Sequence, residues 1–245
     1  MFDAYKVKNA CVAWIRDWFE YNGKGCNAVI GISGGKDSSV VAALCVEALG
    51  KERVIGVLMP DGDQSDINDS YKLCRHLDIQ HFTVPIDGGV YRIQSAILHA
   101  GLELTDQACI NLPARIRMST LFAVAQCCNG RVSCNCNLSE DYIGYSTFGG
   151  DDFGSFAPLR NLTSDEVVAI GDACGLPYEL THKTPSDGLC DKTDEDSFGF
   201  TYEVLNNYIR TGVCEDEAVK AKIDSMHEKN LFKLMPMPTF EYKEN

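Results

Sequence analysis

A glycine- and serine-rich segment, Ser33 to Ser39, carries the residues whose types and spacing are best suited to chemistry. The segment reads Ser-Gly-Gly-Lys-Asp-Ser-Ser and follows a short apolar run that ends in Gly31 and Ile32. Glycine tolerates positive φ and lets the backbone approach a ligand closely, while hydroxyl groups donate to anions. If a helix begins here, its free N–H groups and its dipole favour a phosphate. The segment therefore predicts a phosphate-binding loop.

Asp37 is the residue in this loop that a simple glycine turn does not explain. A bare carboxylate would repel phosphate oxygens, so an aspartate here suits phosphate binding only if it holds a cation. The segment also lacks the glycine spacing and the Lys-Ser/Thr ending of a Walker P-loop. A glycine turn before a capped helix remains the alternative for these residues taken alone.

The apolar pattern places this loop between a strand and a helix. Residues 5–21 have helical periodicity, with Trp14 and Trp18 expected in the core. The segments that follow are expected to alternate between strand and helix: strand 28–32, helix 38–49, strand 54–58, a helix capped by Ser65 that ends at 77, and strand 81–86. This rhythm predicts an α/β fold with a doubly wound, Rossmann-like parallel sheet flanked by helices.

The second half of the chain predicts further helices and one more strand. These elements are expected at 90–100 (helix), 112–128 (helix) and 131–134 (strand). Thr163 and Glu166 have the spacing of a capping box, which predicts the start of a helix. The polar stretch 181–200 predicts a long loop without regular structure, and such loops are usually functional or mobile.

Composition and charge limit the class of partner. The chain of 245 residues carries a net charge of −13, so neither a nucleic acid nor an anionic membrane is expected as partner. No signal peptide is evident, and no apolar run reaches the roughly 18 residues of a membrane helix. The twelve cysteines are scattered, which favours a cytoplasmic protein with reduced thiols. Cys134 and Cys136 lack a second ligand pair at the spacing of a zinc site.

The segment 33–39 resembles the SGGxDS loop of enzymes that cleave ATP between its α and β phosphates. That superfamily includes the NAD, GMP, asparagine and argininosuccinate synthetases and the tRNA-thiolating enzymes. Four further motifs resemble elements of the NAD synthetases: Asn111 to Met118, Asn137 to Glu140 with Gly144 to Thr147, Phe156 to Leu159 with Leu162 to Val167, and Lys183 to Ser186 with Asp194, Glu195 and Gly199. In order and spacing the chain is similar to the ammonia-dependent NAD synthetases from about residue 28 to 202.

This resemblance implies an ATP-dependent ligase that forms an amide. The nicotinate carboxylate of deamido-NAD would attack ATP to give an acyl adenylate and pyrophosphate, and ammonia would then displace AMP. Catalysis would rest on positioning and charge stabilisation rather than on a covalent protein nucleophile. The resemblance also implies Mg²⁺ as cofactor and a homodimer. We expect one domain over residues 1–245 and no glutamine-hydrolysing domain, because 27 residues precede the first strand.

The resemblance also implies roles for individual residues. Asp37 and Glu140 would hold the metal, and Asp37, Lys183 and Ser186 would be catalytic. Lys36, at a variable position of the motif, is expected to be solvated. The residues expected to bind ATP are Gly31, Ile32, Ser33, Gly34, Gly35, Lys36, Asp37, Ser38, Ser39, Met59, Asn135, Ser164 and Ser186. Those expected to bind deamido-NAD are Arg115, which would reach it at a dimer interface, Phe148, Ser155 and Lys233.

Several of these positions depart from the family pattern. Asn135 replaces a threonine, and Ser155 stands where an aspartate is common. Phe148 and Ser164 replace lysines, and the loss of two positive charges bears on the dinucleotide more than on ATP. Taken singly, Glu140 could cap a helix. The alternatives for the whole chain are a related SGGxDS ligase with a different acid substrate and an ATP-binding sensor without turnover.

Overall fold

A parallel four-stranded sheet forms the centre of the protein. The computed structural model describes residues 2–64, 67–183 and 194–242. The strands are β1 (Asn27–Gly31), β2 (Val54–Leu58), β3 (Gln80–Thr83) and β4 (Gly130–Val132), in the order β3-β2-β1-β4. Val29 of β1 pairs with Ile55 on one side and with Val132 on the other.

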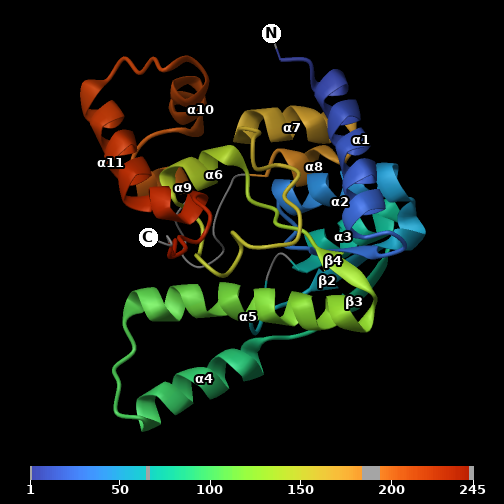
Figure 1. The fold of residues 1–245 in the computed structure, drawn as a ribbon, viewed down its shortest axis with the longest axis horizontal. Coiled ribbons are helices and arrows are strands. Elements are labelled where there is room, and N and C mark those ends of the chain that lie inside the picture. Colours follow the sequence, from blue (N-terminus) through green and yellow to red (C-terminus); the bar gives the residue numbers. More distant parts are fainter. Residues whose placement is uncertain (1, 65–66, 184–193, 243–245) are drawn as a thin grey trace.

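Helices cover both faces of this sheet (Figure 1). On one face lie α1 (Ala4–Asn22), α2 (Lys36–Leu49), α3 (Ile67–Leu77), α7 (Ser164–Ala173) and α8 (Tyr178–Thr181). The opposite face is covered by α5 (Asp106–Cys127), beside which lies α4 (Asp87–His99). Successive strand residues point to opposite faces, so Ala28 and Ile30 join the first core cluster and Val29 joins the second. The predicted doubly wound α/β fold is confirmed.

A smaller apolar cluster joins the remaining helices. These helices are α6 (Leu138–Ile143), α9 (Asp194–Phe198), α10 (Tyr202–Thr211) and α11 (Glu217–Leu234). A short 3₁₀ turn, η1 (Lys51–Arg53), lies elsewhere, directly before β2. The small cluster does not include it. The buried side chains of this cluster are Ile143, Phe198, Phe200, Tyr202, Leu205 and Ile223. In Figure 1 these helices lie together beside the sheet, so residues far apart in the chain meet near α6.

The structure corrects several expectations. Residues 194–198, expected to be irregular, form α9. Helix α5 begins at Asp106, earlier than expected, because Thr105 caps it and Pro113 lies inside the helix rather than at its start. Trp14, expected in the core, is 44% exposed on α1.

Other local expectations are confirmed. Trp18 packs against Phe156, with ring centroids 5.1 Å apart. The capping box at α7 is present, because the Thr163 N–H donates to Glu166 Oε2 at 2.9 Å. The expected cap Ser65 lies outside the described residues. Within the described ranges, no helix combines the length and the apolar character of a membrane span.

Candidate active site

The glycine loop lies where the strand order of the sheet reverses. From β1 the chain runs outward to β2 and β3, and then returns to place β4 on the other side of β1. In doubly wound sheets, ligands bind beyond the carboxyl ends of the strands at such a switch point. The segments after β1 and β4 meet there, because Asn135 Nδ2 donates to the Gly31 carbonyl at 3.0 Å. Ser133 Oγ in turn donates to Asn135 Oδ1 at 2.7 Å.

The loop itself has the geometry of a phosphate cradle. Gly34 has φ +79°, and a Cβ there would meet Asp69 Cβ at 2.9 Å, so only glycine fits. Gly35 precedes α2 and supplies no side-chain cap, so the positive end of the helix dipole faces the loop. The loop's serines fix its shape. Ser33 Oγ lies 3.1 Å from Ser38 Oγ, and Ser39 Oγ donates to the Gly35 carbonyl at 2.7 Å.

Asp37 and Glu140 lie close together although they are far apart in the chain. Asp37 is in the first turn of α2, and Glu140 is in the first turn of α6. Lys36 Nζ lies 2.8 Å from Asp37 Oδ2 and 3.6 Å from Glu140 Oε1. Asn137, the cap of α6, donates through Nδ2 to Asp37 Oδ1 at 2.9 Å. The expectation that Lys36 is solvated is wrong, because the residue is 6% exposed.

The chemistry of this acid pair fits a hard cation. Burial raises the pKa of Glu140 to about 8, with the Asp37 carboxylate adding to the rise and the Lys36 ammonium opposing it. A cation bound beside Glu140 would lower this raised pKa, because it favours the charged carboxylate. Carboxylate oxygens are also the ligands that Mg²⁺ prefers. The described residues hold no group of three or more acidic, histidine or cysteine side chains suited to a metal. A metal at the pair would therefore need further oxygens, such as those of a nucleotide.

Lys183 lies beside the same loop. Its Nζ lies 2.8 Å from Asp69 Oδ2, and Asp69 in the first turn of α3 is the residue that packs on Gly34. Ser70, the next residue, donates through Oγ to the Ile32 carbonyl at 3.2 Å. These contacts attach both Lys183 and α3 to the phosphate cradle. The expected catalytic Ser186 lies outside the described residues.

Ser164 is tied into a buried polar network. Its N–H donates to Ser139 Oγ at 3.0 Å, and its Oγ accepts from Asn206 Nδ2 at 3.0 Å. Ser139 Oγ in turn donates to Asn206 Oδ1 at 2.5 Å. The network joins α6, α7 and α10 directly behind Glu140, so Ser164 stabilises the element that carries this acid. Its predicted contact with ATP remains a prediction.

The residues predicted to contact the dinucleotide form a second group. Arg115 Nε donates to the Phe148 carbonyl at 3.2 Å, and the Phe148 ring lies 5.6 Å from that of Phe232. The neighbouring Lys233 donates through Nζ to the carbonyls at 144 and 146, at 2.8 and 2.9 Å. Burial lowers the pKa of Lys233, while Asp152, Asp151 and Asp141 oppose this shift. The N–H of Ser155 donates to the Val132 carbonyl of β4 at 2.7 Å.

Sequence reasoning assigned no role to three residues that shape the site. Asn137 bonds to Asp37, Asn206 supports Ser139, and the Tyr202 ring lies 5.8 Å from Lys36 Nζ. An asparagine directly before Leu-Ser-Glu is a helix-cap signal, so Asn137 could have been found. No local sequence pattern indicates Asn206 or Tyr202, because both lie on α10, which is far from the other site residues in the sequence and is brought to them by the tertiary fold.

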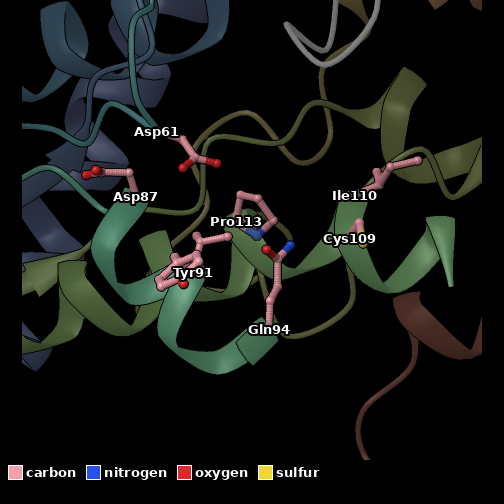
Figure 2. Close-up of a pocket in the computed structure, with 8 residues that line it drawn as sticks. Asp61, Asp87, Tyr91, Gln94, Cys109, Ile110 and Pro113 are labelled. Atoms are coloured by element: carbon pink, nitrogen blue, oxygen red, sulfur yellow. The ribbon is translucent and has the colours of Figure 1, made fainter. Parts of the chain in front are cut away.

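Two hollows lie near the carboxyl ends of the strands. One, of about 400 Å³, follows β2 and β3 and is lined by residues that include Pro60 and Tyr71. Met59 comes directly before Pro60, and its carbonyl accepts from Arg117 Nε at 3.1 Å. Figure 2 shows the other hollow, of about 440 Å³, between α4 and α5: Asp61, Asp87, Val90, Tyr91, Gln94, Cys109, Ile110 and Pro113 line it. Neither lining includes a residue of the glycine loop.

Known proteins resemble the chain in both sequence and fold. An NH(3)-dependent NAD(+) synthetase of Thermococcus sibiricus is 36% identical over 209 residues, which cover 84% of this chain and 80% of the relative. Another NH(3)-dependent NAD(+) synthetase, from Methanococcus aeolicus, is 37% identical over 193 residues, 78% of this chain and 75% of the relative.

Solved structures agree with this relationship. The NMN synthetase from Francisella tularensis has a TM-score of 0.90 at 28% identity, covering 99% of this chain and all of the other. The NH3-dependent NAD synthetase from Campylobacter jejuni has a TM-score of 0.78 at 27% identity, covering 98% of this chain and all of the other. The sequence pattern of the NAD synthase family matches residues 7–244, so this chain is a member of the NAD synthase family.

Proposed function

We propose that the residues around the glycine loop carry out the reaction of this family, the ATP-dependent amidation of deamido-NAD to NAD with ammonia. The observation that carries the proposal is the meeting of Asp37 and Glu140 beside a glycine cradle at the switch point of the sheet. Two carboxylates next to a phosphate-binding loop suit a metal-bound triphosphate. A sensor would need the same cradle but no subsite for an acid substrate.

The reaction joins an acid to ammonia in two steps. The nicotinate carboxylate attacks the α-phosphorus of ATP, the bond to the bridging oxygen breaks, and pyrophosphate leaves. Ammonia then attacks the acyl carbon, loses a proton to solvent, and AMP departs with the electron pair of the acyl–oxygen bond. Each step develops negative charge on phosphate oxygens, so fixed positive charges and N–H groups stabilise its transition state.

Each described site residue has a place in this scheme. The segment 33–39 would bind the pyrophosphate end of ATP, and the backbone at Met59, beside the hollow after β2, would contact adenine. Asp37 and Glu140 would hold Mg²⁺, which when bound neutralises charge on the phosphates. Lys183, beside Gly34 through Asp69, would neutralise the departing pyrophosphate.

The other half of the site would bind the acid substrate. Arg115, Phe148 and Lys233 lie together, and Arg115 and Lys233 would meet its phosphates while the Phe148 ring packs against an apolar surface. A second candidate function is the amidation of nicotinate mononucleotide, because the chain superposes with a TM-score of 0.90 on a protein named NMN synthetase. Phe148, at a position where relatives often carry a lysine, also suits a substrate with fewer phosphates.

We also propose a cytoplasmic homodimer. Large apolar side chains on the α4–α5 pair and on the connection between the two helices are exposed to solvent: Tyr91, Leu98, Leu102 and Ile110. Such a patch marks an interaction surface, and in Figure 1 this helix pair projects from the sheet. Every cysteine that the structure describes is a free thiol, which is usual in a reducing compartment.

One assay tests the chemistry and separates the candidates. The purified protein is supplied with ATP, MgCl₂ and NH₄Cl, and either deamido-NAD or nicotinate mononucleotide, and the amide, AMP and pyrophosphate are measured. We expect equal amounts of the three products, and the better substrate is the one with the higher kcat/KM. Asp37→Asn should abolish turnover and keep the fold, whereas Asp17→Asn on the exposed side of α1 should change neither. ATP binding without product from either acid would exclude both candidate substrates and leave a sensor or a related ligase with a different acid substrate.

A further inference from the structure

The Lys36 side chain is buried at the centre of the candidate metal site. Its exposed fraction is 7%, against 19% for Asp37 and 18% for Glu140. Lysine is almost never buried unless its charge is paired, and here both carboxylates lie within 4 Å of the ammonium. The Tyr202 ring, 5.8 Å away, adds an aromatic face from α10. The side chain is therefore held between α2, α6 and α10.

The Lys36 ammonium links the two acids of the pair. Asp37 Oδ2 accepts from Lys36 Nζ at 2.8 Å, and Asp37 Oδ1 accepts from Asn137 Nδ2 at 2.9 Å. Both carboxylate oxygens of Asp37 thus have a donor, and the ammonium bridges Asp37 to Glu140. The two acids come from helices that follow different strands, and without a cation between them their contact would place two acidic groups side by side.

We infer that Lys36 is a built-in cation that keeps Asp37 and Glu140 together in the metal-free protein and competes with a divalent cation for them. The identity of that cation rests on the proposed function, but the role of Lys36 in the metal-free protein does not. One unit of positive charge a few ångströms from a divalent ion weakens its binding. The phosphates of ATP bring negative charge that offsets this repulsion. The site should therefore bind the free metal weakly and the metal together with ATP well.

Replacing the ammonium tests this inference directly. Lys36→Met keeps the length of the side chain and removes its charge, and Lys36→Arg keeps the charge. Lys24→Met is the matched control, because Lys24 pairs with Glu20 on the exposed surface of α1 and its loop. Two quantities are measured without ATP: the Mg²⁺ dissociation constant by calorimetry, and the urea midpoint of unfolding in EDTA.

We expect Lys36→Met to bind free Mg²⁺ about tenfold more tightly than the wild type, since the competing charge is gone. The same variant should unfold at a lower urea concentration in EDTA, and added Mg²⁺ should recover most of that difference. Lys36→Arg and Lys24→Met should stay close to the wild type in both measurements. If Lys36→Met has the Mg²⁺ affinity and the urea midpoint of Lys24→Met, the inference is wrong.

Two further variants keep the outcomes separate. If Asp37→Asn binds free Mg²⁺ as the wild type does, the proposed metal site fails, while the urea midpoint in EDTA still tests the role of Lys36. If Lys36→Met does not fold, the double variant with Glu140→Gln removes one of the repelling charges and should restore folding. A double variant no more stable than the single one would overturn the inference.

Discussion

Replacing Gly34 by alanine should damage the phosphate loop in a way that can be measured in parts. Gly34 has φ +79°, where an L-residue is strained. An added Cβ would also lie 2.9 Å from Asp69 Cβ and 3.1 Å from the Ser70 backbone nitrogen. These atoms belong to the first turn of α3, so the methyl group can be accommodated only if the loop or the start of α3 moves.

The expected cost has two contributions. The left-handed backbone disfavours a Cβ by roughly 1–2 kcal/mol. Overpacking against atoms that cannot rotate away typically adds about 1–3 kcal/mol. We therefore expect Gly34→Ala to lower the free energy of unfolding by about 2–5 kcal/mol. Any movement of Asp69 also moves Lys183, which it contacts, so ATP binding should weaken together with stability.

Gly25→Ala separates the two contributions. Gly25 has φ +72°, but an added Cβ there has nothing within 4 Å. Its cost should be the backbone contribution alone, about 1–2 kcal/mol, and ATP affinity should not change. Urea unfolding followed by circular dichroism gives the stabilities, and calorimetric titration with ATP-Mg gives the affinities. Equal losses of stability in the two variants, with ATP affinity intact in both, would refute the packing argument for Gly34.

Three further predictions concern other parts of the molecule. Leu102→Glu in the exposed patch of the α4–α5 pair should convert the proposed dimer into monomers in sedimentation velocity, and an unchanged dimer would exclude this face. Arg160→Met removes the partner of buried Asp141, whose pKa burial raises while Arg160 opposes the rise. Breaking a buried ion pair costs about 3–5 kcal/mol and losing an exposed one about 0.2–1 kcal/mol; because Arg160 is itself 40% exposed, we expect a loss between these, about 2 kcal/mol at pH 7 in urea unfolding. That loss should shrink as the pH falls through the raised pKa of Asp141 and the carboxyl group becomes neutral, and a loss independent of pH would contradict the assignment. A thiol reagent at pH 8 should label exposed Cys127 in the folded protein but not Cys74, whose pKa burial raises to about 11, and equal labelling of the two before unfolding would show that Cys74 is accessible.

The features that could be read from the sequence are those set by neighbouring residues. The apolar strands and the capping box at Thr163 and Glu166 depend on spacings of two to four residues, and the structure confirms both. The order of elements then indicated a parallel sheet, and a parallel sheet brings the ends of β1 and β4 to one edge. This geometry explains why Asp37 and Glu140 meet, but their pairing was expected only because their motifs resemble those of the NAD synthetases.

The features that could not be read depend on contacts between distant helices. Lys36 looks like a surface lysine in its own helix, and only the approach of α6 and α10 makes it buried. Helix α10 carries recognisable end signals, since Thr201 caps it and Gly212 ends it with positive φ. Those signals give its length but not its place against Lys36, because no spacing in the sequence relates the two.

The placement of the acids explains why a buried cation is needed at all. Asp37 and Glu140 both lie in first turns of helices, where the helix dipole stabilises an anion by about 0.3–1 kcal/mol. Removing a carboxylate from water costs several kcal/mol, so two dipoles cannot stabilise two such groups side by side. A phosphate bound by the neighbouring loop would add to the negative charge at the two acids. Positive charge between the acids therefore favours their contact, and Lys36 is the side chain that supplies it.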